Sequence, residues 1–381
     1  MLYGRMSSMD LRSGEIQPCD EIEIENDRAK FSEVIGTQHS SWKKISEIKI
    51  TIGLTLKSKP ASHWIFLFLS STVMLVAFTA SSLLSRAYYA GGGRSYWIIS
   101  WAAVAGWPLI PLFSIPFYIF MENSLSPVTL KLLTWFVVLG FISFIDNLFF
   151  AWAYAYLSAS TASLVASTSL VFSVLFGYFI AKNKMNLSSI NASVIITAST
   201  IIIALDSKFD KIPGVTSTQY ALAFLWDILG SALHGLLFAL SELVFINILG
   251  RRSFHVVLEL QTMISFFAFL FTTIGVIINN DFHGMRLEGE VFEYGKSSYY
   301  IIIVWTAVTF QLGVLAGTAV LYLASTILAG VLNATRVPLT SIVAVILFHD
   351  PMSGFKILSL FLTLWGFASY TLGHANGKSD P

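Results

Sequence analysis

A succession of long apolar runs, separated by short polar breaks, dominates the sequence between residues 63 and 373. About 20 apolar residues are enough to cross the hydrocarbon core of a bilayer as a helix. Inside a bilayer a helix satisfies its own backbone hydrogen bonds, so such runs predict an all-α membrane protein. We place ten transmembrane helices at 63–85, 97–120, 132–155, 158–181, 187–205, 219–245, 256–279, 299–323, 326–348 and 355–373.

Composition supports this class and excludes others. Of the 381 residues, 55% are hydrophobic and 12% are charged, whereas a soluble domain carries about 25% charged residues. A soluble enzyme is therefore excluded. The mean hydropathy of +0.71 is too high for an outer-membrane barrel with alternating strands. The net charge of +1 gives no basic surface for nucleic acid, and the single Cys19 excludes an intrachain disulfide or a thiolate zinc site.

Polar segments divide the chain. Residues 1–62 mix charges, contain acidic runs and show no signal peptide, so we expect a disordered cytosolic tail. The polar segment 206–218 separates two five-helix halves, 63–205 and 219–373, and residues 374–381 form a C-terminal tail.

The two halves carry a similar segment at the same relative place. Tyr156-Leu157-Ser158-Ala159-Ser160-Thr161 opens the fourth span, and Tyr322-Leu323-Ala324-Ser325-Thr326 opens the ninth. Because five is odd, a second copy runs inverted through the membrane, and inverted repeats with a site between them are typical of transporters. The alternative is that Ser, Thr and small residues simply recur at helix starts.

Lys and Arg near the span ends set the orientation. With a cytosolic N-terminus, eleven lie on the inner side and seven, Arg86 and Lys356 among them, on the outer side. Without the five in the tail the comparison is six against seven, so the tail alone decides the prediction that both termini are cytosolic.

Ionisable residues inside spans are costly and indicate function. We select Asp146, His234, Glu242 and Glu259 as candidates for proton coupling. At 100° per residue, Asp227, His234 and Glu242 share one stripe of their helix and can face a common cavity. The alternative for Asp227 and Glu259 is a position near the membrane interface, in contact with water, and we expect this position for Asp227. The alternative for His234 is a packing role.

Other polar and aromatic residues of the spans are candidates for substrate binding: Trp107, Asn147, Trp152, Gln261, Gln311, Asn333 and Arg336. One arginine among several acids favours a neutral or cationic small molecule, since phosphate esters need several buried cations. Two plainer interpretations stay open: Arg336 pairs with one of the acids, and the tryptophans only pack. Pro108, Pro111 and Pro116 can bend the second span beside a cavity.

The sequence shows no phosphate-binding loop, no metal motif and no nucleophile–base pair, so we expect neither an enzyme nor a cofactor. A membrane receptor or scaffold and an intramembrane enzyme are the other functional classes. The oligomeric state stays open.

A series of short segments resembles one transporter family over roughly residues 63–373, in order and at the expected spacing. The segments include Leu84-Ser85-Arg86-Ala87-Tyr88-Tyr89, Ala105-Gly106-Trp107-Pro108, Asp146-Asn147-Leu148, Ala151-Trp152-Ala153-Tyr154-Ala155-Tyr156-Leu157, Glu242-Leu243, Glu259-Leu260-Gln261, Pro338-Leu339-Thr340 and Leu364-Trp365-Gly366-Phe367-Ala368-Ser369-Tyr370. They are similar to the plant purine permease family of the drug/metabolite transporter superfamily.

That resemblance implies ten helices in two inverted five-helix repeats, with proton-coupled uptake of purines, cytokinins or, in some members, alkaloids or vitamin B6 forms. We place the protein in the plasma membrane; an endomembrane exporter is the alternative. Ala103, Ser169, Ser341 and His234 depart from the family pattern. Two amides and a carboxylate are thereby lost, which keeps open a divergent member that transports alkaloids or other amines.

Overall fold

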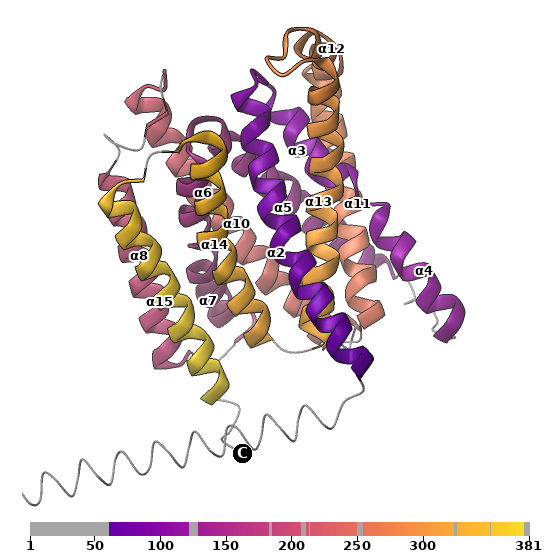
Figure 1. The fold of residues 1–381 in the computed structure, drawn as a ribbon. Coiled ribbons are helices and arrows are strands. Elements are labelled where there is room, and N and C mark those ends of the chain that lie inside the picture. Colours follow the sequence, from indigo (N-terminus) through magenta and orange to yellow (C-terminus); the bar gives the residue numbers. More distant parts are fainter. Residues whose placement is uncertain are drawn as a thin grey trace, which may run out of the picture. The chain divides into compact units, whose positions relative to one another are not determined.

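The computed structural model describes residues 61–121, 129–182, 185–206, 211–212, 214–249, 254–323, 326–350 and 352–376. The chain divides into units 1–64 and 65–381, and the second unit holds the fold. The expected tail, apart from the first residues of α2, lies outside the described part. Every regular element within that part is helical (Figure 1). The elements are α2 (Ala61–Ala90), α3 (Tyr96–Ala105), α4 (Leu109–Met121), α5 (Leu130–Tyr156), α6 (Ala159–Ala166), α7 (Ser169–Phe179), α8 (Leu187–Leu205), α10 (Ser217–Val244), the π-helix η1 (Phe245–Leu249), α11 (Phe254–Ile278), α12 (Asp281–Val291), α13 (Lys296–Leu323), α14 (Thr326–Phe348) and α15 (Gly354–Asn376).

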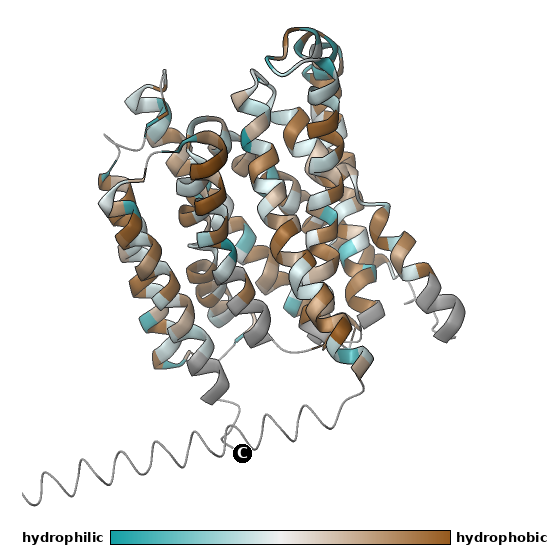
Figure 2. Cartoon of the chain, in the orientation of Figure 1, coloured by the Kyte–Doolittle hydropathy of each residue, from teal (hydrophilic) through white to brown (hydrophobic). Residues whose placement is uncertain are grey.

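Eight helical segments of the described part are long and apolar enough to cross a membrane. They are Ala61–Ala90, Tyr96–Ile115, Leu130–Tyr156, Ala159–Phe179, Leu187–Leu205, Ser217–Leu249, Val256–Ile278 and Lys296–Val320. Apolar residues cover most of their length (Figure 2). The helices α14 and α15 follow these eight. The prediction of an all-α membrane protein is confirmed.

The second span is broken, as its prolines predict. The helix α3 ends at Ala105, Gly106 caps it, and α4 begins at Leu109 after Pro108. Proline has no N–H to donate, so a helix cannot continue unchanged through it. The break leaves backbone groups of residues 106–108 inside the bundle, where α11 and α13 pack against α4.

The short joint between the third and fourth spans is a real chain reversal. Leu157 is extended, and the Ser158 side chain accepts from Thr161 N to cap α6. A serine at this position satisfies an N–H that the helix itself cannot. The corresponding joint at 324–325 lies outside the described residues.

The polar break between the expected spans 256–279 and 299–323 contains the helix α12. Asn280 turns the chain with a left-handed φ of 57°, and Asp281 stands in the first turn, where a negative charge favours the helix dipole. The helix forms because its polar face makes hydrogen bonds with residues of the bundle that are distant in the sequence.

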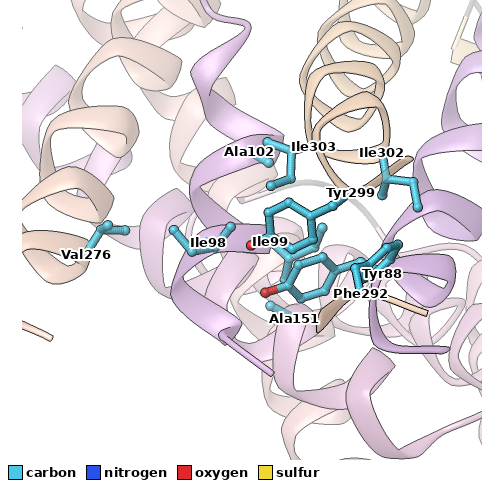
Figure 3. Close-up of a cluster of buried hydrophobic side chains, with 10 residues drawn as sticks. All are labelled: Tyr88, Ile98, Ile99, Ala102, Ala151, Val276, Phe292, Tyr299, Ile302 and Ile303. Carbon is cyan, nitrogen blue, oxygen red and sulfur yellow. The ribbon is translucent and has the colours of Figure 1, made fainter. Parts of the chain in front are cut away.

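Glu288 ties α12 to the ends of three spanning helices. Its carboxylate accepts from Tyr88 OH at 2.6 Å, from Tyr299 OH at 3.0 Å, and from the backbone N–H groups of Arg94 and Ser95 at 3.1 and 3.2 Å. Figure 3 shows the rings of Tyr88 and Tyr299 side by side, with their hydroxyl oxygens pointing the same way. We call this group the Glu288 cap. It fixes α12 against the start of α3.

The helices α8 and α15 are joined along their length by small polar side chains. Ser199 Oγ donates to Ser359 O at 2.7 Å and lies 2.8 Å from Thr363 Oγ1, while Ser359 Oγ donates back to Ser199 O at 3.1 Å. Asn191 Nδ2 donates to Ser369 Oγ at 2.9 Å near the other end. Small residues allow this close approach and polar groups add hydrogen bonds that lipid cannot replace.

Other helix pairs cross between the two halves of the chain. The helix α5 packs on α10 and α11, α3 packs on α11 and α13, and α6 packs on α14. On the α5–α11 contact, Gly140 allows close approach, since a Cβ there would overlap with Phe267 Cβ and lie 3.2 Å from Ala268 N. The residues between these helices are the candidates for a functional site.

Candidate functional site

A carboxyl–imidazole pair joins α5 to α10. Asp146 Oδ2 lies 2.9 Å from His234 Nδ1, and the Asp146 side chain is 6% exposed against 39% for His234. The aspartate lies on the same buried face of α5 as Ser143 and Leu139, three and seven residues earlier. Its second oxygen, Oδ1, has no hydrogen-bond partner. The predicted candidates Asp146 and His234 therefore come together.

Asp227 is a correction to the expectation of a water-exposed residue near the interface. It is 0% exposed, and neither carboxyl oxygen has a hydrogen-bond partner. The reason is packing: α10 lies against α5, α6 and α7, which cover this face. Asp146 lies close enough for its charge to act on Asp227. The stripe predicted for α10 thus brings Asp227 and His234 to the same carboxyl on α5.

Two further groups extend this polar line toward α14. Tyr154, two turns beyond Asp146 on α5, interacts electrostatically with both Asp227 and Arg336. The Arg336 guanidinium lies over the Phe78 ring, 5.4 Å from its centre, a cation–π arrangement. Within the described residues the ion pairs are His234–Asp146 and Lys296–Glu290. The interpretation of Arg336 as the ion-pair partner of an intramembrane acid is therefore wrong.

The amide candidates differ in their surroundings. Asn147 Nδ2 donates to Ser143 O at 2.7 Å, and Gln261 Nε2 donates to Ser265 Oγ at 3.3 Å, each within its own helix. Both are half-buried, so their carbonyl oxygens and second N–H groups keep capacity for a ligand.

Gln311 instead bridges two helices beside the broken span. Its Nε2 donates to Ala103 O at 3.2 Å, while its Oε1 has no partner and the residue is 0% exposed. Gly106 allows this approach, because a Cβ there would overlap with the Ala307 carbonyl. The free oxygen is an acceptor that suits an N–H donor.

The tryptophan candidates lie in aromatic contacts. Trp107 meets Phe266 edge to face at 5.0 Å between ring centres. Trp152 lies 4.8 Å from Trp226, and it also stacks on Phe149 at 5.9 Å. Packing thus accounts for much of the surface of Trp152, while all of these rings remain only half-buried.

The remaining candidates are Glu242, Glu259 and Asn333. Glu242 is half-buried on α10 and interacts electrostatically with Tyr370 on α15. Glu259 is half-buried near the start of α11. Asn333 belongs to α14, but its side chain lies outside the described residues. Of the predicted stripe on α10, Glu242 therefore faces different neighbours from Asp227 and His234.

A second buried polar group, which sequence reasoning missed, surrounds Lys356. Its Nζ donates to Ser158 Oγ at 3.2 Å and to Ser160 Oγ at 2.9 Å, and the residue is 1% exposed. Asp350 Oδ2 accepts from Ser160 N and Oγ at 3.4 and 3.3 Å. With Arg86, Asp206 and Ser353 these residues form what we call the Lys356 cluster. The sequence contains the signal, a lysine inside the apolar run 355–373, but Lys356 enters the prediction above only as a positive charge on the outer side.

The Lys356 cluster is electrostatically balanced. Burial raises the pKa of the Asp350 carboxyl above its usual value of 3.8, while the Ser160 N–H and the charges of Lys356 and Arg86 act in the opposite direction. Ser353 Oγ donates to Asp206 and accepts from Lys356 N at 3.0 Å. The cluster joins α2, α6 and α8 to α15 and differs in place and composition from the Asp146 line.

A cavity of about 330 Å³ lies between α7, α8 and α10. It is lined by apolar side chains together with Thr168, Thr197 and Thr200, whose hydroxyls already donate to carbonyls of their own segments. In the described part of the chain, no three His, Cys, Asp or Glu side chains are placed to hold a metal ion. The polar line on α5, α10 and α14 is therefore the better candidate site.

Comparison with known proteins identifies the family. Residues 65–380 match the family described as purine nucleobase transmembrane transport. Probable purine permease 5 of Arabidopsis thaliana is 58% identical over 91% of this chain and 95% of that protein. Probable purine permease 11 of the same plant is 34% identical, over 83% of this chain and 84% of that protein, and purine permease 3 is 28% identical, over 81% and 90%. The chain therefore belongs to the plant purine permease family, whose members are multi-pass membrane transporters of purines and not enzymes.

Proposed function

We propose that the chain is a proton-coupled symporter that takes up purine bases, cytokinins or related nitrogen heterocycles by alternating access. The buried Asp146–His234 pair carries this proposal. It lies between α5 of the first half and α10 of the second, and its groups can bind a proton. A proton that neutralises Asp146 lowers the cost of moving the empty site through the membrane.

Polar and aromatic groups along the same helices suit a flat, nitrogen-rich substrate. The free Oε1 of Gln311 can accept from a ring N–H, and the half-buried amides of Asn147 and Gln261 can donate or accept. Trp107 and Trp152 offer ring faces for stacking. Arg336 and Asn333 complete the set of proposed substrate-binding residues, and Glu242 and Glu259 remain proton-coupling candidates.

The proposed architecture is ten helices in two inverted repeats, 63–205 and 219–373, joined by 206–218. The contacts between helices support it, because replacing both helices of a contacting pair by their counterparts in the other repeat gives another contacting pair. The pairs α3·α13, α3·α5 and α7·α8 have the counterparts α11·α5, α11·α13 and α14·α15. The pairs α3·α11, α6·α14 and α8·α15 each join a helix to its own counterpart, as expected of a twofold-related pair of repeats.

Burial of two cations supports cytosolic termini. Arg86 and Lys356, counted above among the seven basic residues of the outer side, are 8% and 1% exposed. Without them the outer loops keep five Lys and Arg, while the inner loops outside the N-terminal tail hold six. The loops themselves thus favour the same orientation as the tail. We place the protein in the plasma membrane.

The test is uptake into yeast that lacks its own purine carriers. Labelled adenine, a cytokinin, an alkaloid and pyridoxine are supplied at pH 5 and pH 7.5, with and without a protonophore. We expect adenine or cytokinin uptake that acid stimulates and the protonophore abolishes. Asp146→Asn should weaken the acid stimulation at unchanged surface expression, as Glu242→Gln should if Glu242 also carries a proton.

The exposed Glu290→Gln variant serves as the matched control and should behave as wild type. Uptake of an alkaloid alone would replace the purine assignment by the divergent, amine-transporting alternative. Absence of all uptake with the protein at the cell surface would overturn the proposal of uptake and favour an exporter of internal membranes. Acid stimulation of unchanged size in Asp146→Asn would remove Asp146 from the coupling mechanism.

A further inference from the structure

Asp227 stands out among the buried acids of the described residues. Asp146 has His234, Asp206 has Ser353, and Asp350 has Ser160 as a hydrogen-bond partner. Asp227 has none on either oxygen, although it is 0% exposed. A buried carboxylate without a donor costs several kcal/mol by desolvation. Something that the polypeptide does not provide must therefore balance this group.

Ser231, one helical turn later, lacks a partner as well. Its Oγ is buried at 0% exposure and makes no hydrogen bond. Elsewhere in these helices, hydroxyls such as those of Thr272, Thr340 and Ser341 donate to the carbonyl four residues earlier. Ser231 does not use the Asp227 carbonyl in this way, so its O–H is available to the same buried space.

The charged surroundings of Asp227 contain no cation that could neutralise it directly. From α5 it is faced by Asp146 and Tyr154. The helix α6 has no titratable side chain, and Tyr178, the titratable residue of α7, is 47% exposed. On α10 itself the nearest basic group, His234, pairs with Asp146. The neighbour that acts on Asp227 most is thus another acid.

The room near Asp227 is small. A Cβ on Gly230, three residues later in α10, would stand in van der Waals contact with Phe149 Cβ at 3.4 Å and with the Phe150 ring at 3.5 Å, so about one methyl group fits there. Two carboxyls and a hydroxyl also fall short of the oxygen shell that a metal cation needs. A proton needs no such space, and two nearby carboxyls in one dry core cannot both stay ionised without cost.

We propose that Asp227 is a second proton-binding carboxyl of the transport cycle, so that Asp227 and Asp146 together carry two protons with each substrate molecule. The inference rests on the proposed function, because it assigns a number of protons to the proposed symport. Ser231 donates to Asp227 when that carboxyl loses its proton. His234 does the same for Asp146, which separates the two binding events by their donors.

The test measures proton number in vesicles. The purified full-length protein is reconstituted with membrane potential clamped to zero, and labelled adenine is set at a tenfold inverse gradient. Each proton contributes a tenfold gradient per pH unit, so net flux reverses at a pH difference of about 0.5 for two protons and about 1 for one. We expect about 0.5 for the wild type and about 1 for Asp227→Asn, with adenine exchange at equal pH retained in both.

Other outcomes separate the two proposals. A wild type that exchanges adenine but shows no pH-dependent reversal contradicts the proposed symport itself. An unchanged reversal point in Asp227→Asn contradicts the second proton site alone, as does loss of equal-pH exchange in a variant whose thermal unfolding is normal. If the Asn variant fails to fold, Asp227→Leu fills the same buried volume without a polar group and is measured in its place. Glu290→Gln is the expression control.

Discussion

His234 Nδ1 and Asp146 Oδ2 lie 2.9 Å apart across the boundary between the two halves of the chain, with 88 positions between them in the sequence. The pair links a buried acceptor on α5 to a more open ring on α10. It therefore contributes both to the packing of the halves and to the proposed site.

Removal of the His234 ring should destabilise the protein while Asp146 is present, and much less once Asp146 is also replaced. His234→Ala leaves a buried carboxyl oxygen without its donor, at about 1–3 kcal/mol. In the double variant with Asp146→Asn the cost should be well below the sum of the two single changes. Thermal unfolding of the detergent-purified protein, followed by tryptophan fluorescence, measures this. Additive single changes would mean that the contact does not hold the halves together.

The Glu288 cap should be a larger source of stability than a nearby surface ion pair. Glu288→Ala leaves two buried tyrosine hydroxyls and two N–H groups without their acceptor, so we expect a loss of about 2–4 kcal/mol. Glu290→Ala breaks the exposed pair with Lys296, which water and salt screen, so we expect a much smaller loss. Chemical denaturation of both variants gives the comparison. Equal losses would show that α12 is not held through Glu288.

Two glycines should respond to the same substitution with opposite signs. Gly140→Ala places a Cβ against Phe267 and Ala268 and should destabilise the protein by about 1–3 kcal/mol. Gly284→Ala, inside α12 and with nothing within 4 Å of the new Cβ, should stabilise it by about 0.5–1 kcal/mol through the unfolded state. Melting temperatures of the two variants decide the matter. A stabilising Gly140→Ala would disprove the close α5–α11 contact.

The raised pKa of Asp350 should appear in the pH dependence of stability. The folded protein keeps the Asp350 proton to higher pH than the unfolded chain, whose value is about 3.8. The contribution is present below that value and is lost as pH rises through the folded pKa. The melting temperature of the wild type, relative to Asp350→Asn, should therefore fall as pH rises from about 4 and then level off. A constant difference between pH 4 and pH 8 would contradict the shift.

Much of the fold could be predicted from the sequence because membrane helices are recognised by their length and hydropathy. The break at Pro108 and the reversal at Leu157 and Ser158 follow from the missing N–H of proline and the capping power of serine. The helix α12 does not, since Tyr88, Arg94 and Ser95, which donate to its Glu288 carboxylate, lie about 200 positions away. The burial of Lys356 could not be predicted for the same reason: its serine partners belong to the other half of the chain.

The candidate site was predictable in its residues but not in its pairing. The rotation of 100° per residue places Asp227, His234 and Glu242 on one stripe, and Asp146 is the acid that the third span offers. Which helix covers each part of that stripe depends on how α5 and α10 turn toward each other. Glu242 lies about 22 Å along the helix axis from Asp227, so it meets Tyr370 on α15 instead of the α5 carboxyl. The helices α5, α6 and α7 bury Asp227, which the sequence alone had left beside water.

The hydrogen bonds between α8 and α15 also bear on how the molecule would move. Ser199, Ser359 and Thr363 bind the two helices to each other near their middle, and Asn191 binds Ser369 further along. One helix cannot slide past the other without breaking several of these bonds in a medium that offers no substitutes. The two helices therefore move together as one rigid unit, to which each half of the chain contributes one helix. In the proposed alternating access, the remaining helices would have to tilt relative to this rigid unit in order to open the site first to one side of the membrane and then to the other.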